Sequence, residues 1–145
     1  MRSHRRICAC RGTSTLEFIV VLPALLLIFL ASVELSRAWL TLNLVTQAAR
    51  EGARVGAATS PFDPAAAIQR INEVLCGGKP TSDALCMATL ASAAASVTLA
   101  APGAPDSPVT ATVTMNFDTV VPLMLPILAG PVPITETAVM RFEGP

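Results

Sequence analysis

Apolar residues gather in one uninterrupted run near the start of the chain, and they alternate with polar residues towards its end. The run reads FIVVLPALLLIFLASV over residues 18–33 and contains no charge. Together with Leu16 and Glu17 it has eighteen residues, at the short end of the roughly 17 to 25 that a membrane-spanning helix needs. We therefore expect a transmembrane helix over about residues 16–35, because a chain of 145 residues cannot easily surround so apolar a helix.

A helical repeat continues beyond this run. One helix from residue 14 to about residue 58 would be roughly 65 Å long, and Pro23 would remove one of its backbone hydrogen bonds. Small side chains let another backbone approach closely, so the repeat predicts packing against either the C-terminal part of the same chain or other helices. Its members follow one another in steps of three and four: Leu35, Ala38, Leu42, Val45, Ala49, Gly52 and Gly56.

A short second helix is expected after a turn sequence at residues 60–64. Asp63 is a suitable N-cap, and Pro64 suits the first helical position. Two consecutive glycines, Gly77 and Gly78, predict the end of this helix. Its apolar face comprises Ile68, Ile71 and Leu75.

Three strands are expected in the rest of the chain, at residues 96–100, 109–117 and 131–142. The second, VTATVTMNF, alternates apolar and polar residues as a half-buried strand does. The apolar connection VVPLMLPILAG at residues 120–130 contains two prolines and is too short to span a bilayer. We expect it to pack on the sheet or to contact the membrane or a partner. A long helix, a short helix and a small antiparallel sheet make an α+β fold.

Charge is distributed unevenly, although the net charge is zero. The chain beyond residue 12 holds six basic and ten acidic residues. A basic flank keeps its end of a membrane helix in the cytoplasm, so we predict a cytoplasmic leader (1–12), a helical segment (13–58) and a small extracytoplasmic domain (59–145). Four arginines and no acid precede the apolar run: Arg2, Arg5, Arg6 and Arg11.

The junction before the apolar run predicts proteolytic processing. Gly12 follows the basic leader, and Glu17 is the fifth residue beyond it. This spacing resembles the type III signal of type IV pilins, which an aspartic prepilin peptidase cleaves after the glycine. Glycine lets the backbone enter a narrow site without a side chain. Cleavage there would make Thr13 the first residue and retain the helix, whereas the stretch after Val33 offers no convincing site for a secretory signal peptidase.

Further motifs make the resemblance more specific. The chain has the opening Gly–small–small–x–Leu–Glu–Phe from Gly12, an early Pro23, an acid at Glu34 and the sequence AAREGAR at residues 48–54. In this order they resemble the TadE-like family of tight-adherence pilus systems, over roughly residues 11–58. The resemblance implies a pseudopilin or minor pilin-like subunit of the bacterial inner membrane. Its implied partners are the membrane, a prepilin peptidase and other pilus or pseudopilin subunits.

The resemblance also implies a role for Glu17. In pilins the acid at this place pairs with the new amino terminus of a neighbouring subunit during assembly, and an acid at the edge of an apolar run is expensive in lipid unless it serves such a purpose. The alternative interpretation of the whole chain is a signal-anchored envelope structural protein with no pilus role, whose helix is only a tether.

The cysteines and the single histidine argue against an enzyme. His4 lies in the expected leader, so no His-based catalytic triad or His-ligated zinc site fits the mature chain. Cys8 and Cys10 precede the membrane helix, while Cys76 and Cys86 follow it in an oxidising compartment. A Cys76–Cys86 disulfide is therefore favoured over free thiols, and no metal site is expected. No phosphate-binding glycine motif or basic–aromatic patch is present, so we expect no cofactor, nucleic acid or small-molecule substrate.

Overall fold

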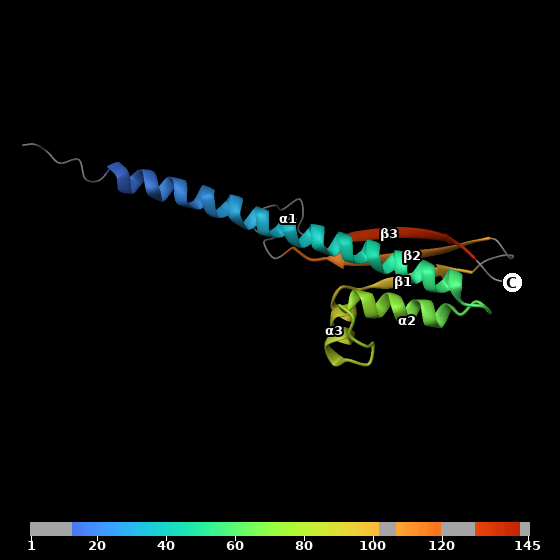
Figure 1. Ribbon diagram of the computed structural model, residues 1–145. Helices are drawn as coiled ribbons and strands as arrows, with labels where there is room; N and C mark the ends of the chain where they lie inside the picture. The colour runs from blue at the N-terminus through green and yellow to red at the C-terminus, as the bar shows by residue number, and fades with distance from the viewer. Residues whose placement is uncertain (1–12, 102–106, 120–129, 143–145) are drawn as a thin grey trace, which may run out of the picture.

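The chain forms an α+β fold around one long helix (Figure 1). The computed structural model describes residues 13–101, 107–119 and 130–142. The predicted leader and nearly all of the apolar connection at residues 120–130 lie outside these ranges. The elements are α1 (Thr13–Ala58), α2 (Pro64–Leu75), α3 (Ala84–Ser92), β1 (Ser96–Ala100), β2 (Pro108–Phe117) and β3 (Val132–Arg141).

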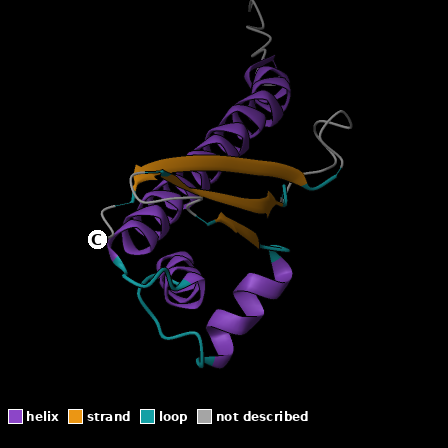
Figure 2. Cartoon of the chain, turned by 90° about the vertical axis from the view of Figure 1, so that its right-hand side faces the viewer, coloured by secondary structure: helices purple, strands orange, loops and turns teal. Residues whose placement is uncertain are grey.

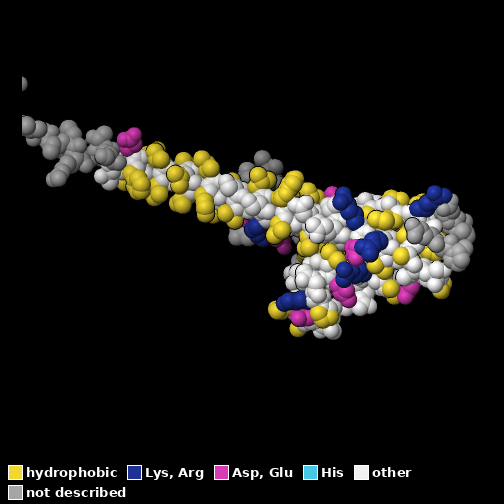
Figure 3. Space-filling view, viewed as in Figure 1, with side chains coloured by type: hydrophobic (Ala, Val, Ile, Leu, Met, Phe, Trp, Pro, Cys, Tyr) yellow, Lys and Arg dark blue, Asp and Glu magenta, His cyan; other side chains and the backbone are white. Residues whose placement is uncertain are grey.

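The first helix, α1, has 46 residues and continues through Pro23, which makes it about 69 Å long. Its N-terminal half is largely exposed: the exposed large apolar side chains between residues 16 and 40 are 41–74% accessible. Figure 3 shows this half coated with hydrophobic side chains. Its best eighteen-residue window has a mean hydropathy of 2.6, and among the described residues α1 is the one helix long and apolar enough to cross a membrane.

The C-terminal half of α1 is covered by the rest of the chain. It contacts α2, β2 and β3, and Figure 2 shows α1 passing along one face of the sheet beside α2. Of the predicted stripe, Val45, Ala49, Gly52 and Gly56 are buried, whereas Leu35 is exposed. The buried part of the stripe thus packs against the chain's own C-terminal domain.

The three strands form an antiparallel sheet in the order β1-β2-β3. Alternate residues of β2, such as Val109 and Val113, face the helices and are fully buried. The opposite face carries threonines, and Thr112 lies beside Thr137 with their hydroxyl oxygens 3.1 Å apart. The alternation predicted for β2 is therefore present, with one face in the core and one accessible to solvent.

The second helix forms as expected, and a third one follows that was not predicted. The Asp63 carboxylate accepts a hydrogen bond from the backbone N–H of Ala65 at 2.9 Å and caps α2. After α2, Gly77 and Gly78 have φ angles of 68° and 84°, which favour glycine. No element was predicted for the residues that form α3. Asp83 caps this helix at its N-terminus.

Cys76 and Cys86 are joined by a disulfide with their Cα atoms 5.1 Å apart. Cys76 is the C-cap residue of α2, and Cys86 lies in α3. The bond therefore ties α3 to the end of α2. Its formation in the native protein stays a prediction, which depends on the compartment that this part of the chain occupies.

We predict that alkylation of the native protein without reductant labels neither Cys76 nor Cys86, and that reduction exposes both, as mapped by mass spectrometry. Cys86→Ser should lower the free energy of unfolding by roughly 2–3 kcal/mol, because the reduced chain gains loop entropy when unfolded. The matched variant Cys76→Ser should lose the same amount, since each removes the same bond. Labelling of both cysteines in the undisturbed protein would contradict the bond and the outward orientation.

Candidate functional site

The predicted processing and assembly residues lie at the start of α1. Thr13 is the first residue of the helix, and Glu17 follows one turn later with an exposed side chain. The two residues are separated by about 6 Å along the helix axis. No hydrogen bond or ion pair joins Glu17 to another residue that the structure describes. Gly12, on the other side of the predicted cleavage site, lies outside the described residues.

Two acidic residues flank the uncharged part of α1. Glu17 and Glu34 are seventeen positions apart, or about 26 Å along the helix, close to the roughly 30 Å of a bilayer's hydrocarbon core. Glu34 forms an ion pair with Arg37 at 3.3 Å. The Arg37 guanidinium also lies 5.4 Å from the ring centre of Phe117, at the end of β2. The folded domain therefore meets α1 one turn beyond the uncharged stretch.

Small residues in AAREGAR and just after it form the contact between α1 and the domain. Gly52 leaves space that Ile71 of α2 occupies, and a Cβ atom at this position would collide with the Cγ1 and Cδ1 atoms of Ile71. A Cβ atom on Gly56 would come within 3.1 Å of Cγ1 of Val109 in β2. These two glycines allow α2 and the sheet to approach the backbone of α1 closely.

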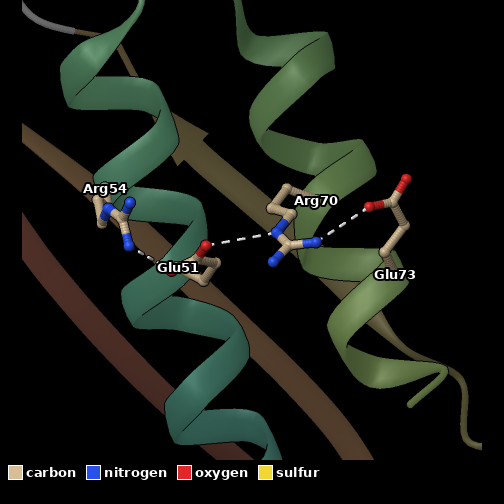
Figure 4. Close-up of polar contacts among 4 residues, drawn as sticks. All are labelled: Glu51, Arg54, Arg70 and Glu73. Carbon is tan, nitrogen blue, oxygen red and sulfur yellow. Dashed lines mark hydrogen bonds and ion pairs between the residues drawn. The ribbon is translucent and has the colours of Figure 1, made fainter. Parts of the chain in front are cut away.

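The charged residues of the same motif face outwards and connect α1 to α2 (Figure 4). The Glu51 carboxylate accepts from Arg54 of its own helix at 3.5 Å and from Nε of Arg70 at 3.4 Å. Arg70 in turn donates to Glu73 at 3.3 Å. Each pair is partly exposed and contributes about 0–1 kcal/mol at most. The network therefore adds little to the free energy of unfolding, but its Glu51–Arg70 pair links α2 to α1.

Sequence reasoning did not find Arg70 as the partner of Glu51. The two residues are nineteen positions apart, and only the docking of α2 brings them together. The acid in AAREGAR was a visible signal, but nothing in the local sequence shows which cation it meets.

The described residues contain no group of three His, Cys, Asp or Glu side chains that could hold a metal ion. The first half of α1 presents a long apolar surface with Glu17 at its start, and the same helix continues into the small domain. Such a surface is suited to association with lipid and with other helices.

Comparison with family models gave a match that covers most of α1. The model of the family described as TadE-like protein matches residues 12–54. Over this segment the chain is similar to the TadE-like family. The TadE-like segment begins at Gly12, contains Glu17 and ends with the last residue of AAREGAR, Arg54. Comparison with curated proteins and with solved structures gave no match.

The TadE-like segment coincides with most of α1. It comprises the uncovered apolar half of α1 and most of the half that packs on the domain. α2, α3 and the sheet lie beyond it. Its C-terminal motif thus supplies the surface on which the rest of the chain folds.

We predict that Gly52→Ala destabilises the domain, although alanine normally favours a helix over glycine by about 1 kcal/mol. The new methyl group would overlap Ile71, and overpacking typically costs about 1–3 kcal/mol. The measurement is chemical denaturation in detergent micelles, followed by circular dichroism.

The control is the double variant Gly52→Ala/Ile71→Ala. If the two side chains compete for one space, the double variant should be more stable than the sum of the two single effects predicts. A gain in stability for Gly52→Ala alone would contradict the close approach of α2.

Proposed function

We propose that the chain is a membrane-anchored pseudopilin or minor pilin-like subunit that serves the assembly of a Flp-type, tight-adherence pilus. The observation that carries the proposal is the TadE-like match over residues 12–54, which includes the uncovered apolar half of α1 and Glu17. The proposed role is structural, because the TadE-like match and the long apolar surface of α1 both favour association with other helices and with lipid.

The proposed location is the bacterial inner membrane, with the N-terminus in the cytoplasm and the C-terminal domain outside. The arginines before the apolar run support this orientation. A prepilin peptidase at the cytoplasmic face would cleave after Gly12 and release the leader. Because the cut precedes α1, the mature subunit keeps its membrane helix.

Cleavage supplies the cation that Glu17 needs. A carboxylate that enters a helix bundle loses part of its hydration, which costs several kcal/mol unless a cation compensates. The new α-amino group of Thr13 is largely protonated near neutral pH. Between two subunits, a pair between Glu17 of one chain and Thr13 of the next would fix the axial stagger of adjacent helices, and so would set the register of assembly.

We predict that Glu17→Ala is inserted and cleaved like the unmodified protein but no longer assembles. Neither insertion nor cleavage needs the carboxylate, whereas the pairing does. The expected result is loss of co-purification and crosslinking with other pilus subunits, together with missing surface pili.

Three matched variants give the experiment its controls. Glu17→Gln keeps the size and removes the charge, so it should fail like Glu17→Ala, while Glu17→Asp keeps the charge and should restore part of the assembly. Thr15→Ala, an exposed neighbour in α1, should assemble normally. If Glu17→Ala supports pili and adherence like the unmodified protein, the acid is passive and the tether interpretation is favoured.

A further inference from the structure

The helix α3 exposes apolar side chains that nothing in the described part of the chain covers. It has nine residues, ALCMATLAS, and no charge. Leu85 is 65% and Met87 59% accessible, while Cys86 between them is buried. α3 is therefore held by its inner face through the disulfide. Leu85 and Met87 lie at the two edges of its uncharged outer side, with the exposed Ala84 and Ala88 between them.

This helix lies close to the point where α1 leaves its uncharged stretch. Thr89 and Ser92 of α3 line one hollow together with Arg37 and Thr41 of α1. Arg37 is only three residues beyond Glu34. The Thr89 hydroxyl donates to the backbone carbonyl of Leu85 at 2.8 Å, so Leu85 is one helical turn from this hollow.

The orientation of α3 differs from that of the other two helices. Figure 1 shows α3 at the end of the folded domain nearest the apolar half of α1. In Figure 2, α2 is seen end-on while α3 is seen from the side, so α3 runs across the direction of α2. If α1 crosses a bilayer, α3 lies roughly in the plane of the membrane surface.

We propose that α3 rests on the lipid surface of the bilayer that α1 spans, with Leu85 and Met87 inserted at the headgroup level. The inference rests on the membrane anchoring in the proposed function. Interfacial helices lie in the membrane plane with their apolar face towards lipid, and the proposed placement of α3 is of this kind.

The level that the exposed apolar residues reach along α1 favours lipid as the occupant. Leu35, Trp39 and Leu40 carry the exposed apolar surface of α1 up to the level of Thr41, which borders the hollow next to α3. Trp39 is a residue type enriched at membrane interfaces. If α1 spans the bilayer, its exposed apolar residues reach about the level of the hollow beside α3, and contact of α3 with lipid would set the tilt of the domain on the membrane.

The test uses tryptophan fluorescence of the full chain in phosphatidylcholine–phosphatidylglycerol vesicles that contain brominated lipid. In a Trp39→Phe background, Leu85→Trp and Met87→Trp each place the single tryptophan on α3. Both should be quenched, and bromines near the headgroups should quench them more than bromines near the bilayer centre. Two positions are used so that one poorly folded variant does not decide the outcome.

Val139→Trp in the same background is the matched control. Val139 is 60% accessible, and it pairs with Thr110 of β2. The neighbouring residue Val109 lies beside Gly56, near the C-terminal end of α1. Val139 is therefore at the end of the domain farthest from the apolar half of α1. It should not be quenched, and equal quenching at residues 85, 87 and 139 would overturn the proposal.

The native Trp39 separates failure of this inference from failure of the proposed anchoring. If Trp39 of the unmodified protein is quenched but residues 85 and 87 are not, α3 does not touch lipid although α1 is inserted. Emission at residue 85 that changes with the protein-to-lipid ratio, without quenching, would assign α3 to a second copy of the chain and also overturn the proposal. Absence of quenching at Trp39 as well would contradict the anchoring itself.

Discussion

The continuous backbone of α1 determines where every other part of the chain lies. Apart from the helix ends and the hydrogen bond that Pro23 cannot donate, its peptide groups are paired within the helix. The side chains therefore largely decide which surroundings each half tolerates. The large apolar residues between residues 16 and 40 are uncovered, and burying such surface is worth about 25 cal/mol for each Å² removed from water. The second half carries Ala and Gly on the face that packs against the folded domain. One rigid helix therefore links two environments.

Close packing on the second half of α1 fixes the folded domain to the helix. Because Gly52 and Gly56 lack side chains, Ile71 and Val109 reach the backbone of α1. α2 then lies along α1, the disulfide at Cys76 holds α3 at the end of α2, and α3 meets the level at which the uncharged stretch ends. In this way Gly52 of AAREGAR, together with Gly56, determines how the domain stands relative to the apolar half of α1.

Local sequence signals predicted most of the fold but not its contacts. α1, α2 and the strands each had a strong local signature: an apolar run, the Asp63 cap, and alternation in VTATVTMNF. α3 was missed because ALCMATLAS has no apolar periodicity and only the Asp83 cap marks it. The Glu51–Arg70 pair could not be foreseen, since it exists only after α2 docks. A periodic stripe shows which face is buried, whereas its partner depends on the tertiary fold.

The central claim is that α1 stays on the mature protein, with Glu17 next to a new amino terminus. The most direct test is the intact mass of the chain extracted from membranes, compared between cells with and without active prepilin peptidase. The account predicts a mature chain that begins at Thr13 in the first case and an uncut precursor in the second. A chain that begins at residue 1 in both, or one cut after Val33 so that the apolar half is lost, would contradict it.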